Sequence, residues 1–118
     1  MKNRTIHFTA TAQEQVRQRK AWWLASRDHA EGFAEKLDQA LRIVAALPGA
    51  GTLYVQSPVR GVRRVYLRRL DAHLYYTFDD ESVIVRALWG ARREHGPRLE
   101  RVVNHPLFGY AGNYLRSS

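Results

Sequence analysis

The 118-residue sequence contains no cysteine, which excludes a disulfide framework and a thiolate metal site. A chain without cysteine suits a reducing compartment, so we predict a cytoplasmic protein. No apolar run approaches the roughly 20 residues that a membrane-spanning helix needs. The first ten residues, MKNRTIHFTA, also lack the apolar core of a secretion signal. The sequence therefore predicts a protein that has no membrane partner.

The signatures of the common catalytic and cofactor sites are also missing. There is no phosphate-binding glycine loop, no metal-ligand spacing, and no serine in the context of a nucleophile. The histidines are scattered along the chain, without a partner at helical or hairpin spacing: His7, His29, His73, His95 and His105. We therefore predict no metal ion and no cofactor.

Lysine is scarce, although the chain is strongly basic. The formal net charge is +8, yet Lys2, Lys20 and Lys36 are the only lysines. Arginine presents a planar fork of donors that matches a carboxylate or a phosphate, so an arginine-dominated excess favours recognition of an anion. The anion is nucleic acid, an acidic protein surface or an acidic segment of a partner, and charge alone does not choose among them.

The length indicates one domain over residues 1–118, with an irregular C-terminal extension from about residue 97. The hydrophobic fraction of 45% and three tryptophans indicate a folded protein. The extension is rich in apolar residues, which either pack back on the domain or await a partner: Leu107, Phe108, Tyr110, Tyr114 and Leu115.

Residues 62–93 predict three consecutive strands in an antiparallel meander. Apolar and polar residues alternate over 65–68, 74–78 and 83–89, which is the period of a half-buried strand. Alternation places one set of side chains toward the core: Val65, Leu67, Leu74, Tyr76, Phe78, Val83, Val85, Ala87 and Trp89. The opposite face combines cations with aromatic rings: Arg64, Tyr66, Arg68, His73, Tyr75, Thr77, Ile84, Arg86 and Leu88. No carboxylate is expected on that second face, which we interpret as a binding surface.

The N-terminal half predicts a strand followed by two helices. Residues 5–9 alternate, and Thr11 with Glu14 has capping-box spacing for a helix that runs to about residue 24 or 25. Ala12, Val16 and Trp23 fall near one face of this helix. A second helix begins near Asp28, and its apolar residues follow helical periodicity to Pro48: Phe33, Leu37, Ala40, Leu41, Val44 and Leu47. We predict an α+β fold in which an N-terminal helical hairpin packs on a small twisted antiparallel sheet.

The order of strand, two helices and basic meander, with VRRVYLRR, HLYYTF and VRALWGARR in succession, resembles the RelE/ParE superfamily of small bacterial toxins. The resemblance extends from about Ile6 to Arg93. It implies the toxin of a type II toxin–antitoxin module, which a cognate antitoxin holds inactive in a hetero-oligomer.

The superfamily divides into RelE-like members, which cut mRNA in the ribosome, and ParE-like members, which poison DNA gyrase. Arg64 and Arg68 match basic strand positions of RelE-like enzymes, and Arg92 matches the arginine after the last strand. The C-terminal tyrosine of those enzymes does not appear where it is expected, because His95-Gly96-Pro97 occupies that region. The GARR ending is more similar to ParE-type members. The resemblance therefore favours a ParE-like toxin that binds gyrase and has no catalytic residue of its own.

Two alternatives remain open. The first is a ribosome-dependent, metal-independent mRNA endonuclease that uses a proton-transferring group and phosphate-neutralising arginines: Arg64, Arg68, His73, Tyr75, Arg86 and Arg92. The second is a non-toxic nucleic-acid-binding module. For the binding toxin, we predict that the partner contacts Arg64, Tyr66, Arg68, Arg86, Arg92, Arg93, Leu107, Phe108 and Tyr110.

Overall fold

A computed structural model describes residues 3–26, 32–99 and 107–109 of the chain, and these residues form two helices and one six-stranded sheet. The helices are α1 (Ala10–Ser26) and α2 (Phe33–Ala46). The strands are β1 (Thr5–Thr9), β2 (Thr52–Leu53), β3 (Arg63–Leu67), β4 (Ala72–Phe78), β5 (Ser82–Gly90) and β6 (Leu107–Gly109). The α+β class predicted from the sequence is confirmed.

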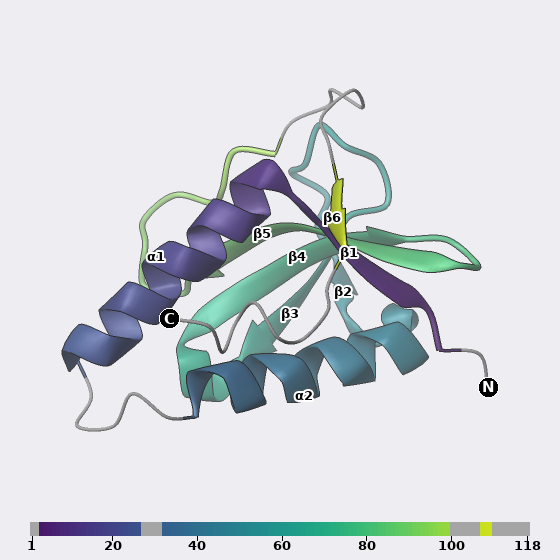
Figure 1. The fold of residues 1–118 in the computed structure, drawn as a ribbon. Coiled ribbons are helices and arrows are strands. Elements are labelled where there is room, and N and C mark those ends of the chain that lie inside the picture. The colour runs from purple at the N-terminus through teal and green to yellow at the C-terminus, as the bar shows by residue number, and fades with distance from the viewer. Residues whose placement is uncertain (1–2, 27–31, 100–106, 110–118) are drawn as a thin grey trace.

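The sheet is mixed, so the predicted purely antiparallel sheet is wrong. Its order is β2-β3-β4-β5-β1-β6. The meander β3-β4-β5 is antiparallel as predicted, but β1 runs parallel to β5, with Ile6 opposite Val83. A parallel neighbour requires a long connection between the strands. Here the chain between β1 and β5 includes both helices and the first two strands of the meander (Figure 1).

Both helices pack against the sheet, although they do not lie side by side. They diverge from the end where the rings of Trp23 and Phe33 meet, with their centroids 6.3 Å apart (Figure 1). Both helices contribute to one core on the sheet, as predicted. The predicted hairpin of two adjacent helices is not fully matched. Their buried residues follow helical spacing: Ala12, Val16 and Trp23 on α1, and Phe33, Leu37, Leu41 and Val44 on α2. Leu47, predicted as part of this stripe, is exposed beyond the end of α2.

The helix starts differ from the predicted caps. The side chain of Thr9, rather than that of Thr11, accepts a hydrogen bond from the backbone N–H of Ala12 at 3.1 Å, so Thr9 caps α1. Gly32 precedes α2, and its N–H donates to the Glu35 carboxylate at 3.0 Å. Asp28, the predicted cap of this helix, lies outside the described residues.

A β-bulge in β5 reverses the faces to which the side chains at the C-terminal end of this strand point. Tyr75 pairs with Ala87 and Tyr76 pairs with Val85, so Arg86 is an extra residue without a partner on β4. Beyond it, Leu88 joins the core under the helices, whereas Ala87 and Trp89 point to the opposite face. The predicted faces of these three residues are therefore wrong, because alternation is interrupted at Arg86.

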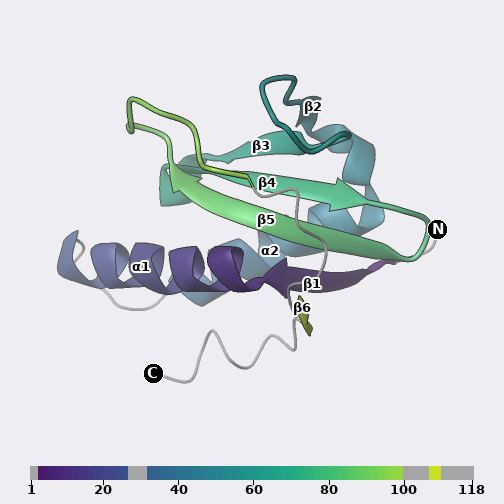
Figure 2. The same ribbon diagram turned by 90° about the horizontal axis from the view of Figure 1, so that it is seen from above.

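The face opposite the helices has a small core of its own. Tyr75 and Ala87 pack there with Val62 and Leu99, flanked by the partly buried Tyr54, Val59 and Trp89. Leu99 reaches this core because the segment that follows β5 folds back across the sheet (Figure 2). The face predicted to be a binding surface is thus partly covered by this second core.

Candidate partner-binding surface

The accessible part of that face centres on a group of five side chains at the turn between β3 and β4, which we call the β3–β4 cluster: Arg64, Tyr66, Asp71, His73 and Arg92. The β3–β4 register places Tyr66 directly opposite His73, and the centroids of their rings are 5.2 Å apart. The ring of His73 also meets the edge of the Tyr75 ring, at 6.3 Å. Cross-strand pairing thus stacks three rings that belong to two strands.

Asp71 joins this row of rings to Arg92. Asp71 occupies the left-handed region, with φ of 49°, just after the 3-10 turn at Arg68–Leu70. Its carboxylate accepts hydrogen bonds from Arg92 Nε at 2.7 Å and from the Tyr66 hydroxyl at 3.2 Å. Burial opposes ionisation, but these two donors outweigh it and hold the pKa of Asp71 below its ordinary value. The sequence predicts no carboxylate on this face, but the Asp71 carboxylate lies there. Strand alternation does not place Asp71, because this residue belongs to the turn.

Arg64 extends the cluster toward the second core. Its guanidinium lies 5.5 Å from the centre of the Tyr54 ring, and Tyr54 in turn packs edge-on against Tyr75 at 5.0 Å. Such cation–π contact orients an arginine without neutralising it. Arg64 and Tyr66 therefore form a cationic, aromatic surface of the kind that the sequence predicts, with His73 partly buried between the rings.

His73 stays neutral at neutral pH in this setting. Partial burial lowers the pKa of His73, and the positive charge of Arg64 lowers it further, while the Asp71 carboxylate partly compensates. Among the described residues, no side chain forms a hydrogen bond with the His73 ring. The ring lies between the rings of Tyr66 and Tyr75, which contact it on two sides.

Three other predicted site residues do not belong to the cluster, although Tyr75 and Arg68 adjoin it. Tyr75 is only 2% exposed and belongs to the second core. Arg86 donates to the Thr77 hydroxyl at 2.9 Å, and burial lowers the pKa of Arg86, although an arginine remains charged. Thr77 lies four residues beyond His73 on β4, which corresponds to about 13 Å along a strand. Arg68 is exposed in the 3-10 turn rather than in the predicted strand.

Three further predicted contact residues fall on separate surfaces. Arg93 lies over the ring of Trp89, with its guanidinium carbon 4.1 Å from the ring centre. Leu107 and Phe108 form β6, which pairs antiparallel with β1 at the far edge of the sheet, and both side chains are exposed. Four strand intervals separate β6 from β3, or about 19 Å across the sheet. Tyr110 lies outside the described residues.

Within the described part of the chain, no group of three or more His, Asp or Glu side chains is arranged to hold a metal ion. None of the helices there is long and apolar enough to cross a membrane.

Comparison with known proteins shows that a similar fold occurs in a solved structure. The fold is similar to that of a chain in the solved structure titled "Chromosomal ParDE TA system from P. aeruginosa", with a TM-score of 0.59 and 12% sequence identity. The match covers 74% of this chain and 95% of that one. No protein-family model matches the sequence, and no curated protein matches it. The likeness supports the ParE-type resemblance read from the sequence, at the level of the fold.

Proposed function

We propose that this chain is the toxin of a type II toxin–antitoxin module, of ParE type, which acts by binding DNA gyrase and is neutralised by a cognate antitoxin. The observation that carries the proposal is the similarity of its fold to a chain of the ParDE structure, which extends over nearly all of that chain. The basic excess of the sequence supports an acidic partner.

The β3–β4 cluster supports binding rather than catalysis. A general base must be oriented toward the proton that it removes. His73 instead packs between Tyr66 and Tyr75, and the neighbouring carboxylate of Asp71 contacts Arg92 and Tyr66. Aromatic rings and arginines at a surface are the side chains that contribute most to protein–protein affinity.

The proposal is tested by expressing the full chain from an inducible promoter and comparing growth with an empty vector. We expect growth arrest, and relief of the arrest when the protein encoded beside this gene is co-expressed. The same purified preparation should inhibit supercoiling by DNA gyrase and leave mRNA intact on translating ribosomes. Normal growth with confirmed soluble expression would contradict the toxin function, and arrest without gyrase inhibition would contradict the target.

One observation favours a RelE-like, ribosome-dependent mRNA endonuclease as the second candidate. The lowered pKa of His73 keeps its ring neutral, which is the form that a general base requires. Two members of the predicted nuclease set are less suited to contact RNA, because Tyr75 is buried and Arg86 donates to Thr77. Cleavage of mRNA on ribosomes by the purified chain would establish this candidate in place of the first.

A non-toxic nucleic-acid-binding module is distinguished by its dependence on salt. Binding of bare DNA or RNA that weakens steeply between low and physiological salt would indicate release of counterions from phosphates. A toxin that recognises a protein surface would show no tight binding to either nucleic acid under the same conditions.

A further inference from the structure

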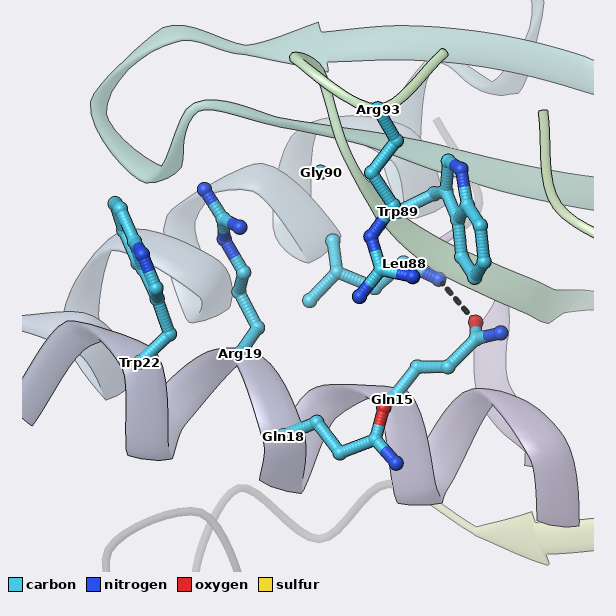
Figure 3. Close-up of a pocket in the computed structure, with 8 residues that line it drawn as sticks. All are labelled: Gln15, Gln18, Arg19, Trp22, Leu88, Trp89, Gly90 and Arg93. Carbon is cyan, nitrogen blue, oxygen red and sulfur yellow. Dashed lines mark hydrogen bonds between the residues drawn. The ribbon is translucent and has the colours of Figure 1, made fainter. Parts of the chain in front are cut away.

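A small pocket lies between α1 and the end of β5, and its Arg19 also contacts the backbone of Asp71 in the β3–β4 cluster. Figure 3 shows its lining: Gln15, Gln18, Arg19, Trp22, Leu88, Trp89, Gly90 and Arg93. These side chains include two guanidinium groups, two amides and two indole rings, and no carboxylate. The pocket is therefore a cationic, aromatic site built from two elements that are distant in sequence.

Arg19 is fixed in the pocket wall by contacts on two sides. Its Nε and Nη2 donate to the Leu70 carbonyl at 3.1 and 2.9 Å, and Nη2 also donates to the Asp71 carbonyl at 2.9 Å. Its guanidinium carbon lies 3.8 Å from the centre of the Trp22 ring. A Cβ atom at Gly90 would come within 2.9 Å of Arg19 Nη1. The absence of a side chain at this position therefore gives the Arg19 guanidinium room to pack against β5.

Arg93 and Trp89 form the facing wall. The guanidinium of Arg93 is stacked on the indole of Trp89 at 4.1 Å, and the Trp89 Nε1–H donates to the backbone carbonyl of His95. Gln15 accepts a hydrogen bond from the Leu88 N–H at 2.9 Å through its amide oxygen, as Figure 3 shows. This bond commits the oxygen of that amide to the backbone, which leaves its NH₂ group as a donor.

The composition and the size of the pocket together indicate what it can hold. Guanidinium and amide N–H groups are donors that match a carboxylate, and such charge-assisted hydrogen bonds are among the stronger ones in proteins. The pocket has a volume of about 90 Å³, whereas sites for small molecules and nucleotides usually have volumes of roughly 300–1,000 Å³. A single side chain fits this space and a nucleotide does not.

We infer that this pocket binds one acidic side chain, Asp or Glu, from an extended or helical segment of a protein partner. The carboxylate lies between Arg19 and Arg93, and apolar residues next to it in the partner pack on the indoles of Trp22 and Trp89. Trp22 is 38% exposed, so it offers apolar surface for such contact. The inference does not require the chain to be a toxin, because it concerns a peptide-binding site that is measured on the isolated protein.

The experiment uses twelve-residue random peptides displayed on phage and selected against the full-length chain. We expect the selected peptides to share an acidic residue flanked by apolar ones. The affinity of one selected peptide, and of its Glu→Gln or Asp→Asn counterpart, is then measured by fluorescence anisotropy against wild type and three variants. Selection of peptides without an acidic residue would overturn the inference.

The three variants are Arg93→Gln, Gln18→Glu and Arg17→Gln, and each lowers the net charge by one. Arg93→Gln removes a cation from the pocket, and Gln18→Glu places a competing carboxylate at its edge. Arg17→Gln is the matched control, because Arg17 lies on the same helix, is mostly exposed and contacts Glu14. We expect the first two to weaken peptide binding about tenfold or more, and the control to weaken it less than about twofold.

The peptide variant completes a double-mutant cycle. If the acidic residue contacts Arg93, the peptide lacking it should bind wild type and Arg93→Gln about equally. Equal weakening by Arg93→Gln and Arg17→Gln would show only general electrostatic attraction and would contradict the inference. Binding of a twelve-nucleotide single strand in an Arg93-dependent manner, with no peptide binding, would identify nucleic acid as the ligand instead. Circular dichroism of each variant confirms that the fold is retained.

Discussion

At the scale of single residues, the hydroxyl of Tyr76 ties the sheet to the segment that follows α2. This hydroxyl donates to the Pro48 carbonyl at 2.6 Å and accepts from the Gly51 N–H at 3.0 Å. Burial raises the pKa of Tyr76, although the Gly51 bond and the charge of Arg63 oppose the rise, so the phenol keeps the proton that it donates. Both backbone groups depend on this one side chain for a buried partner.

We predict that Tyr76→Phe destabilises the protein by about 1–3 kcal/mol, because it leaves buried backbone groups without partners. The free energy of unfolding is measured by urea denaturation. Tyr66→Phe is the matched control, since its hydroxyl also forms a hydrogen bond, to Asp71, but its side chain is 49% exposed. The control should cost about 0.5 kcal/mol or less. Equal losses in the two variants would show that burial of the hydroxyl is not what matters.

The protonation of His73 is a second property that its neighbours determine. Burial and the charge of Arg64 lower its pKa below the ordinary 6.5, and Asp71 opposes this shift. We therefore expect the pKa measured by NMR titration of the ring to rise in Arg64→Gln and to fall in Asp71→Asn. Shifts in the opposite directions would mean that the charges do not act on the ring as the structure places them.

The lowered pKa of His73 also fixes the sign of a stability change. The unfolded chain binds a proton at His73 near pH 6.5, whereas the folded chain binds it only at lower pH. The contribution of His73 to the free energy of unfolding should therefore decrease as the pH falls from above 6.5 toward the folded pKa, and then level off. The difference between wild type and His73→Gln, measured from pH 8 to pH 5, isolates this contribution.

At the scale of elements, the bulge at Arg86 determines which side chains of β5 support the helices. After the bulge, Leu88 is 2% exposed in the first core, while Ala87 and Trp89 belong to the opposite face. Arg86 lies on the same face as Thr77, as the alternation before the bulge predicts, and donates to the Thr77 hydroxyl. One inserted residue thus brings Trp89 to the face of the second core, where Arg93 lies over its ring.

We predict that Leu88→Ala costs about 2–5 kcal/mol of stability, because it opens a cavity under α1. Leu53→Ala, at a strand residue that is 56% exposed, is the matched control and should cost about 0.5 kcal/mol or less. Thermal or urea unfolding measures both. A small loss for Leu88→Ala would indicate that β5 keeps the uninterrupted alternation and that Leu88 faces solvent.

The sequence was sufficient for elements that local patterns determine, and insufficient where distant segments meet. Helical spacing identified Phe33, Leu37, Leu41 and Val44 as the buried stripe of α2, and alternation located the meander. A bulge depends on how two strands are paired, and no residue type at Arg86 signals it. Likewise, the parallel pairing of β1 with β5 and the approach of Leu99 to Tyr75 depend on contacts far apart in the chain. Alternation was thus sufficient to place Arg64, Tyr66 and His73 on one face, and it did not indicate that Asp71 joins them there.

At the scale of the whole molecule, the arginines described above belong to two adjoining sites. The β3–β4 cluster lies on the side of the second core, whereas Arg19 and Arg93 line a pocket beside α1. β6 occupies the edge next to β1, and the two-residue β2 forms the opposite edge. The two sites adjoin at Asp71, whose backbone carbonyl accepts a hydrogen bond from Arg19 and whose carboxylate accepts one from Arg92.

This arrangement leads to a prediction that separates a binding toxin from a nuclease. In a nuclease, His73 or an arginine stabilises charge in the transition state, and losing one such group lowers the rate by orders of magnitude. In a binding toxin, the same arginines form contacts whose loss weakens the effect in proportion to the affinity lost. We expect His73→Ala to retain most of the toxicity, because its ring is held by packing and no proton transfer is assigned to it. Arg64→Ala combined with Arg68→Ala should shift the inducer dose needed for growth arrest upward without abolishing the arrest.

The measurement is growth inhibition over a range of inducer concentrations, with protein levels quantified in each culture. His73 is partly buried, so the fold of His73→Ala is checked by circular dichroism before toxicities are compared. Arg42→Ala serves as the control for the arginine variants, because Arg42 lies on α2, is mostly exposed and forms an ion pair with Asp38 through its Nε. Complete loss of toxicity in a folded His73→Ala variant, together with mRNA cleavage by wild type on ribosomes, would assign His73 a catalytic role. The gyrase-binding function would then give way to the endonuclease.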